Sequence, residues 1–183
     1  MATATRLLTY EDLERLDGDG KRYEILDGRL IELASPEVVH QRVLRRLLGW
    51  FDNFVTAHDL GEVFGAPLDV RLSTHNIVQP DLIFVSYARF GVVEKRPIEG
   101  APDLLVEILS PSTGARDRGE KMVIYARHGV REYWLVDIDH QVVTVFGLVG
   151  DRYEILPQNE GAARSSVLAG LSIDLTALFA GAR

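Results

Sequence analysis

Two short apolar stretches each hold one acidic residue: VQPDLIFVS, residues 78–86, holds Asp81, and PDLLVEILS, residues 102–110, holds Glu107. Leucine and β-branched residues bounded by turn residues are typical of buried strands, so we predict two strands of one sheet here. An ionised carboxylate flanked by Leu, Ile, Val and Phe is costly to desolvate unless its charge is compensated. Each acid therefore points outward from a half-buried strand, pairs with an arginine, or binds a cation.

Considered together, the two acids favour a cation. Consecutive strands of a sheet bring such side chains within a few ångströms, where two carboxylates repel each other unless a cation lies between them. The chain has no cysteine, and none of its histidines forms an H-E-x-x-H motif. A hard oxygen ligand set without thiolates indicates Mg²⁺ or Mn²⁺ rather than zinc. We therefore expect Asp81 and Glu107 to be metal ligands.

The segments on either side of these strands alternate between helical and strand patterns. The predicted elements are a short helix after Thr9, a hairpin at 22–33 over Asp27-Gly28, a helix from Ser35-Pro36-Glu37 to about His58, strands near 62–64 and 67–72, a helix from Asp117 to His128, a buried strand at 132–136, a hairpin at 141–156 over Gly150-Asp151, and a strand remnant or short helix at 171–179. This order predicts a single mixed α/β domain over residues 1–183 with a central sheet.

Composition and charge limit the classes of protein. The chain has 183 residues, of which 46% are hydrophobic and 26% are charged, and these values are ordinary for a globular domain. The net charge of −7 argues against a general polyanion-coating protein, in which Lys and Arg would outnumber the acids. The N-terminus lacks the ~7–15-residue apolar stretch of a signal peptide, and no apolar run reaches the ~20 residues that span a bilayer. We expect a cytoplasmic protein outside the membrane.

A lysine adds a third candidate to the two acids. Lys121 lies in the helix predicted after the strand of Glu107, four residues before Tyr125, so that the two side chains share one helix face. It is an ordinary solvated residue unless this helix lies over the sheet end that carries the acids. There, its ammonium could orient an attacking water and offset negative charge that develops on a phosphorane. A phosphate-binding loop is not indicated at residues 114–119, because Glu120 rather than lysine follows the two glycines.

Five stretches of the chain together resemble the Uma-two family of restriction-endonuclease-like proteins, within the PD-(D/E)XK nuclease superfamily. They are YEILDGRL (23–30), SPEVVHQRV (35–43), VQPDLIFV (78–85), PDLLVEILSPST (102–113) and GEKMVIYARHGVREYWLVD (119–137). The resemblance implies an α/β fold with a restriction-endonuclease-like core, αβββαβ. In that core, helices flank a mixed central sheet and a β-hairpin precedes them.

The resemblance also implies roles for five residues. The metal-binding aspartate falls on Asp81 and the second acid on Glu107. The lysine of the superfamily would stand two residues after Glu107, where this chain has Leu109, so the implied lysine is Lys121 on the following helix. Glu24 matches an early acid that could supply a further ligand. His40 matches a position that faces the site or the phosphate.

Three hypotheses for function follow. The first is an endonuclease that uses Mg²⁺ or Mn²⁺ to hydrolyse DNA phosphodiester bonds, and the second shares the site but acts on RNA or other phosphodiesters. The third is a catalytically weak or inactive binding or regulatory module that keeps the nuclease fold, because Leu109 and the acidic charge leave room for it. DNA is the expected partner, and we expect a homodimer because superfamily members that cut both strands commonly pair.

Basic residues occur in two groups near the predicted helices. They are Arg42, Arg45 and Arg46 in one group and Arg116, Arg118, Lys121, Arg127 and Arg131 in the other. Either the two groups line one groove for a phosphate backbone, or they are ordinary solvated helix faces.

Overall fold

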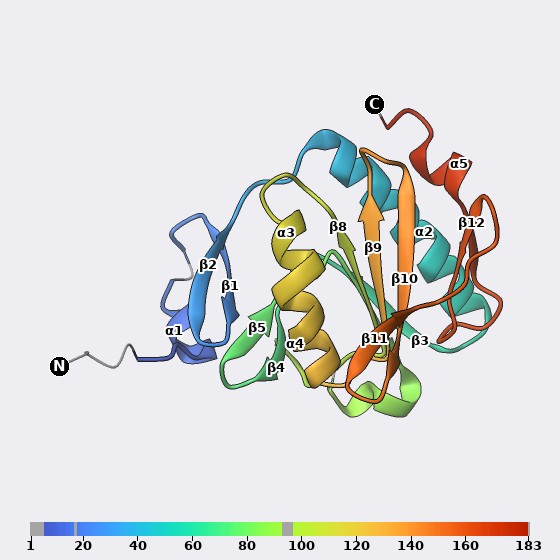
Figure 1. The fold of residues 1–183 in the computed structure, drawn as a ribbon. Helices are drawn as coiled ribbons and strands as arrows, with labels where there is room; N and C mark the ends of the chain where they lie inside the picture. The colour runs from blue at the N-terminus through green and yellow to red at the C-terminus, as the bar shows by residue number, and fades with distance from the viewer. Residues whose placement is uncertain (1–5, 17, 93–96, 183) are drawn as a thin grey trace.

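The computed structural model of the chain describes residues 6–16, 18–92 and 97–182 (Figure 1). The helices are α1 Tyr10–Glu14, α2 Val38–Ala57, the 3₁₀ helix η1 Tyr87–Val92, α3 Gly114–Arg116, the π-helical turn η2 Asp117–Lys121, α4 Met122–Arg127 and α5 Leu175–Phe179. The strands are β1 Arg22–Leu26, β2 Arg29–Leu33, β3 Gly61–Gly65, β4 Val70–Ser73, β5 Asn76–Val78, β6 Leu82–Ser86, β7 Ile98–Glu99, β8 Leu104–Ile108, β9 Glu132–Asp137, β10 Val142–Val149, β11 Arg152–Ile155, β12 Ala162–Arg164 and β13 Ser172–Asp174.

The strands form two mixed sheets and a short two-stranded ribbon. The larger sheet has six strands in the order β11-β10-β9-β8-β6-β3, and the smaller has five in the order β2-β1-β5-β4-β7. In the larger sheet β8 and β9 run parallel, whereas β6 runs antiparallel to both β3 and β8. The larger sheet is the expected mixed central sheet, and the predicted hairpin joins β4, β5 and β7 in a second sheet that was not expected. The chain leaves the larger sheet after β3, and β5 pairs with the N-terminal hairpin through Ile25 and Ile77.

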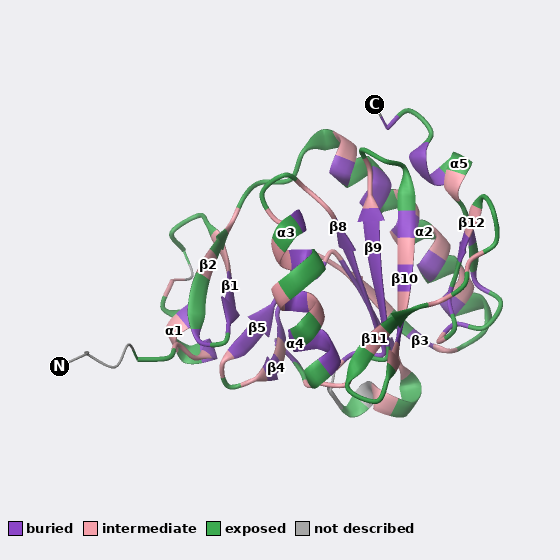
Figure 2. Cartoon of the chain, in the orientation of Figure 1, coloured by how far each residue is buried: buried purple, intermediate pink, exposed green. Residues whose placement is uncertain are grey.

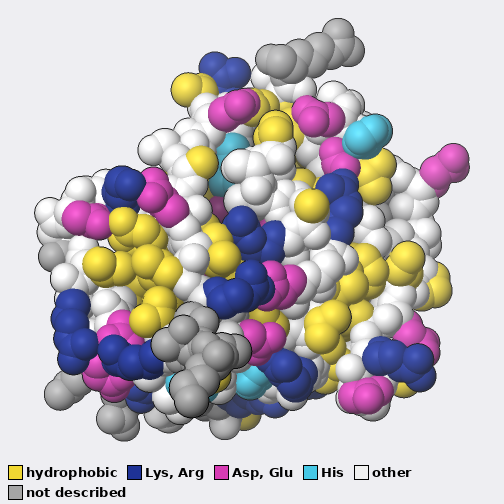
Figure 3. All heavy atoms as spheres, turned by 60° about the vertical axis from the view of Figure 1, so that its left-hand side comes forward, with side chains coloured by type: hydrophobic (Ala, Val, Ile, Leu, Met, Phe, Trp, Pro, Cys, Tyr) yellow, Lys and Arg dark blue, Asp and Glu magenta, His cyan; other side chains and the backbone are white. Residues whose placement is uncertain are grey.

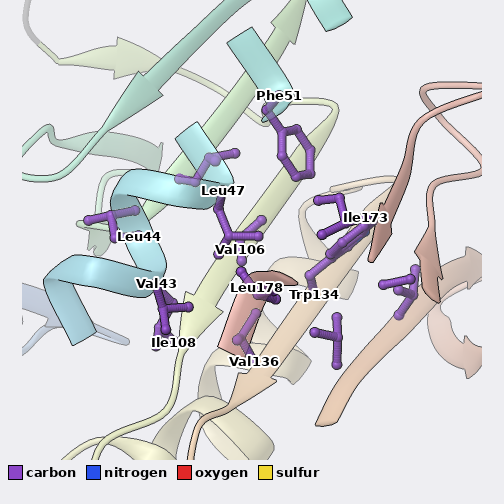
Figure 4. Close-up of a cluster of buried hydrophobic side chains, with 14 of the residues drawn as sticks. Val43, Leu44, Leu47, Phe51, Val106, Ile108, Trp134, Val136, Ile173 and Leu178 are labelled. Atoms are coloured by element: carbon purple, nitrogen blue, oxygen red, sulfur yellow. The ribbon is translucent and has the colours of Figure 1, made fainter. Parts of the chain in front are cut away.

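Apolar side chains cover both faces of the larger sheet. On one face, Val43, Leu47 and Phe51 of α2 point toward Val106 of β8 and Trp134 of β9 (Figure 4). Burial of each such side chain contributes about 1.5–3 kcal/mol, so this layer is a main source of stability. On the opposite face, the segment from α3 to α4 packs with strands of both sheets. The strands between these layers, β8 and β9, are buried along almost their whole length (Figure 2).

The connection from α2 to the larger sheet depends on one glycine. Gly61 has φ 153°, and a Cβ atom at this position would lie 2.1 Å from the carbonyl oxygen of Val85 in β6. Such a separation is a severe clash, so only glycine lets β3 approach β6 this closely. This contact places α2, β3 and β6 in one rigid unit ahead of the strand that carries Glu107.

Most of the local predictions are confirmed. The hairpin turns at Asp27 and Gly28, both with positive φ, as the Asp-Gly pair favours. The C-terminal segment forms both the short strand β13 and the short helix α5. The helix predicted from Asp117 begins earlier, at Gly114, and contains the π-helical turn.

The elements around the larger sheet follow the chain in the order α2, β3, β6, β8, α3 to α4, and β9, with β4 and β5 inserted after β3. The helix that carries Lys121 thus connects the two central parallel strands. Within the part of the chain that the structure describes, no helix has the length and apolar character needed to cross a membrane.

Candidate active site

A cavity of about 540 Å³ lies at the carboxyl end of β8, between the hairpin, the start of α2 and the π-helical turn. All five residues singled out from the sequence line it: Glu24 from β1, His40 from α2, Asp81 before β6, Glu107 from β8 and Lys121 from η2. Five separate segments of the chain therefore bring these side chains to one place.

Asp81 lies beside Glu107 because of the strand register. Strands β6 and β8 pair Leu82 with Val106, so one further step along this antiparallel ladder puts Asp81 opposite Glu107. Directly opposite residues have Cβ atoms about 4.5–5.5 Å apart. The backbone N–H of Ile108 donates to Asp81 Oδ2 at 2.8 Å, and His40 Nε2 lies 3.2 Å from the same oxygen. These contacts fix the orientation of the carboxylate and connect it to α2.

Lys121 lies among three buried carboxylates. Its Nζ atom is 2.5 Å from Glu107 Oε1, 2.8 Å from Glu24 Oε1 and 3.7 Å from Asp117 Oδ1. Only 3% of Lys121 is exposed, so it is far from a solvated helix residue. The hydroxyl of Tyr125, one helical turn further on, donates to Glu107 Oε1 at 2.6 Å. The shared helix face of the lysine and the tyrosine therefore converges on a single glutamate oxygen.

Charges and burial shift the proton affinities of this cluster. Burial raises the pKa of the Glu107 carboxyl well above its usual range, and neighbouring acids add to this, whereas the Lys121 ammonium opposes it. Burial by itself would lower the pKa of Lys121, but the charges of Glu107, Glu24 and Asp117 together hold it well above its ordinary value. Burial likewise raises the pKa of Asp117. Lys121 therefore stays protonated and acts as a fixed positive charge rather than as a base.

The π-helical turn determines how this helix faces the cavity. Asp117 and Lys121, its first and last residues, both line the cavity and are both buried. The Tyr133 hydroxyl on β9 donates to the Asp117 backbone oxygen at 3.1 Å. Isolated π-helical turns are common at functional sites. Asp117 was not among the predicted site residues, although an acid four residues before Lys121 is a signal that could have suggested it.

Gln79 connects the acids to the smaller sheet. Its backbone N–H donates to Glu24 Oε1 at 2.8 Å, and its side-chain Nε2 donates to Asp69 Oδ1 at 2.8 Å. Glu24 thus receives hydrogen bonds from both Gln79 and Lys121 on one oxygen. These bonds hold the glutamate against the cavity wall.

Unpartnered acceptors gather in this cavity. Four buried polar side-chain atoms in the described residues lack a hydrogen-bond partner, and they are Glu24 Oε2, His40 Nδ1, Gln79 Oε1 and Asp117 Oδ2. All four residues line the cavity. Carboxylate and amide oxygens only accept hydrogen bonds, so a species that offers positive charge or donors suits this space.

The carboxylate oxygens that line the cavity fit a hard divalent cation, because oxygen ligands suit Mg²⁺ and Mn²⁺. Among residues 6–16, 18–92 and 97–182, however, no three Asp, Glu or His side chains form a ready coordination cluster. The place between Glu24, Glu107 and Asp117 is taken by the ammonium of Lys121. The chemistry of the ligands therefore fits a cation, and Lys121 supplies the positive charge in this arrangement.

The two groups of basic residues do not line this cavity together. Of the two groups, only Lys121 lines the cavity, where Arg22 is the other basic residue. Five of the others have partners elsewhere: Arg42 and Arg46 donate to backbone oxygens of Gly181 and Leu178, Arg118 pairs with Asp137, Arg127 with Asp27, and Arg131 with Asp103. On the face in Figure 3, Lys and Arg side chains lie beside Asp and Glu side chains. Carboxylates thus pair with three of these guanidinium groups, those of Arg118, Arg127 and Arg131.

The chain is thus a mixed α/β protein with an acid-lined cavity at the end of β8. The sequence profile of the Uma2 family, described as "Putative restriction endonuclease", matches residues 8–178, and the chain belongs to this family. The resemblance seen in the sequence is thereby confirmed.

Two similar proteins extend this result. An uncharacterized protein of Synechocystis sp., slr1290, is 28% identical over 130 residues, which are 70% of this chain and 64% of that protein. The match thus spans less than two thirds of the relative. A crystal structure of a putative nuclease belonging to DUF820 from Anabaena variabilis has a TM-score of 0.79 at 21% identity, covering 96% of this chain and 99% of the other. This similarity establishes a shared fold.

Proposed function

We propose that this chain is an endonuclease that uses Mg²⁺ or Mn²⁺ to hydrolyse DNA phosphodiester bonds in the cavity at the end of β8. The observation that carries the proposal is the buried lysine among carboxylates in a cavity with unpartnered acceptors. The order α2, β3, β6, β8, α3 to α4, β9 supports a restriction-endonuclease-like core, and membership of the Uma2 family supports the reaction class.

Charge makes a cation necessary for this reaction. The cavity is lined by more acids than bases: Glu24, Glu37, Asp81, Glu107 and Asp117 against Arg22 and Lys121. A phosphodiester would be repelled by these carboxylates unless a bound cation offset them. A divalent cation at Asp81 and Glu107, with Glu24 as a further ligand, would polarise a phosphoryl oxygen and make an attacking water more acidic.

The chain's own residues would orient and stabilise the reacting groups. Lys121, which remains protonated, would stabilise the negative charge that develops on the phosphoryl oxygens. His40 would hold Asp81 in place through the contact at 3.2 Å. Tyr125 would keep Glu107 in its orientation through the hydrogen bond at 2.6 Å.

Calorimetric titration with Mn²⁺ tests the ligand assignment. Asp81→Asn and Glu107→Gln are each expected to abolish Mn²⁺ binding, because each removes a charged ligand. Glu62→Gln is the matched control, because Glu62 is an exposed acid on β3 of the same sheet, and it should bind as the wild type does. If both ligand variants bind Mn²⁺ with wild-type affinity, the assigned site is wrong.

Cleavage of supercoiled plasmid tests the reaction. The wild type should nick or linearise the plasmid with Mg²⁺ or Mn²⁺ and not with EDTA, and an RNA substrate in parallel tests the choice of nucleic acid. The alternative function is a catalytically weak or inactive module with the nuclease fold. It is favoured by Leu109 at the superfamily's lysine position and by the lack of a ready coordination cluster among the described residues. No binding at millimolar metal would favour this alternative.

A further inference from the structure

Asp117 is a buried acid with no role in the function proposed above. Only 1% of the residue is exposed, and it lines the same cavity as the metal-ligand candidates. Its Oδ1 atom is 3.7 Å from Lys121 Nζ, while its buried Oδ2 atom has no hydrogen-bond partner. Burial of a carboxylate oxygen without a hydrogen-bond partner costs free energy of folding. A role of Asp117 in the site would explain why an acid occupies this position.

The surroundings of Lys121 provide that reason. A lysine ammonium has three N–H donors, and the two shortest contacts, with Glu107 and Glu24, account for two of them. Both of these carboxylates are also candidate ligands of a divalent cation. A cation bound to Glu107 would draw that carboxylate away from the ammonium and would repel the ammonium itself. Lys121 would then need another counter-ion to remain in the cavity.

We propose that Asp117 is a positioning residue that retains the Lys121 ammonium in the site when Glu107 binds a cation. The inference rests on the proposed function, because it assigns Glu107 to the metal. Asp117 has the free oxygen required, and the Tyr133 hydroxyl holds its backbone oxygen against β9. The π-helical turn sets the acid and the lysine on the same side of the helix at its two ends. An acid and a lysine four residues apart usually form an ion pair on a helix surface. Here the two side chains are buried.

The test uses a readout that does not depend on cleavage. The ¹⁵Nζ resonance of a buried lysine ammonium is observable by NMR because its protons exchange slowly. In the wild type this resonance of Lys121 should persist on saturation with Mg²⁺. In Asp117→Asn it should be present without Mg²⁺ and broaden or vanish with Mg²⁺, because Glu24 is itself a candidate ligand of the cation and position 117 no longer offers a carboxylate. Persistence of the resonance in Asp117→Asn at saturating Mg²⁺ would overturn the proposal.

A metal-free comparison separates this proposal from the proposed function. Glu107→Gln removes the carboxylate that a bound cation would draw away, so the Lys121 resonance should persist in Glu107→Gln. It should be broader in Glu107→Gln with Asp117→Asn, where Glu24 alone of the three carboxylates remains beside the ammonium. This outcome needs no metal binding, and it would stand even if the protein bound no Mg²⁺ at all. Equal spectra from the single and the double variant would refute the role of Asp117. Thermal melts establish that each variant is folded before the spectra are compared.

Kinetics add a second readout. Asp117→Asn should lower kcat about tenfold or more while KM changes less than about threefold, because a displaced Lys121 fails to stabilise the transition state. Glu120→Gln is the matched control, since Glu120 is an acid of the same π-helical turn that pairs with Arg29 outside the cavity. It should leave the resonance and kcat unchanged. A rise in KM with unchanged kcat in Asp117→Asn would contradict a positioning role.

Discussion

Replacing Lys121 by Met removes one buried positive charge and keeps a side chain of similar length. The variant leaves Glu107, Glu24 and Asp117 without the ammonium that lies 2.5, 2.8 and 3.7 Å, respectively, from their nearest oxygens. Removing one partner of a buried ion pair costs about 3–5 kcal/mol. For a chain of this size 1 kcal/mol shifts Tm by about 2–4 °C, so Lys121→Met should melt about 6–20 °C below the wild type at pH 8.

The difference in stability between Lys121→Met and the wild type should depend on pH. Burial raises the pKa of both Glu107 and Asp117 in the folded protein, and loss of the ammonium would raise both values further. The folded state of the variant therefore binds protons more readily than the unfolded chain does, and its stability rises as pH falls. The gap between Lys121→Met and the wild type should be widest at pH 8 and should narrow toward pH 5.

An additional substitution that removes an acid should restore part of the stability that Lys121→Met loses. Lys121→Met with Glu24→Gln has one fewer uncompensated charge, so the double variant should be more stable than Lys121→Met alone. Metal affinity of Lys121→Met should be unchanged or tighter, because a competing cation is gone. Mg²⁺ at about 100 times its Kd would then raise the free energy of unfolding of Lys121→Met by about 2.7 kcal/mol. Cleavage should nevertheless slow by a factor of about 10² or more.

Thermal and urea denaturation followed by circular dichroism measure these effects. The matched control is Lys21→Met, because Lys21 also lies 2.7 Å from a glutamate, Glu32, but both side chains are about half exposed. Exposed ion pairs contribute little to stability, so this control should melt close to the wild type. If Lys121→Met melts as the wild type does at pH 8 and gains nothing at pH 5, the cluster does not depend on the ammonium and the reasoning fails.

Four further predictions concern other parts of the chain. Glu132→Gln should lower stability by about 3 kcal/mol in urea denaturation without changing Mn²⁺ affinity, because its fully buried carboxylate accepts hydrogen bonds from Trp134 and the segment at 166–167. Wild-type stability should fall as pH rises above about 5, because the raised pKa of Glu107 makes the folded state bind more protons than the unfolded state. Tyr125→Phe should weaken Mn²⁺ binding about tenfold by calorimetry, since it frees Glu107 to rotate. Sedimentation velocity should give twice the chain mass of 20.4 kDa if the expected homodimer forms, and the mass of one chain would reject it.

Local structure and the identity of the candidate residues could be predicted from the sequence. The turn at Asp27 and Gly28, the helix α2 and the strand β9 each depend on patterns within a few residues. The acids Asp81 and Glu107 stood out because a carboxylate in an apolar strand needs compensation. Glu24 and His40 required the family resemblance, which also assigned the superfamily's lysine to Lys121, because the usual position holds Leu109.

The arrangement of these parts was decided by tertiary structure. The choice between one sheet and two depends on which distant strand β5 meets, and the pairing of Ile25 with Ile77 joins segments about 50 residues apart. Likewise, the ion pair of Arg127 with Asp27 joins two segments that are distant in sequence. The buried position of Asp117 depends on the π-helical turn and on Tyr133 of β9. Hydrophobic periodicity and turn preferences depend on residues that are close in sequence, so they can be read from the sequence. The burial and the partner of a charged side chain depend on segments that are distant in sequence and pack around it in the folded protein.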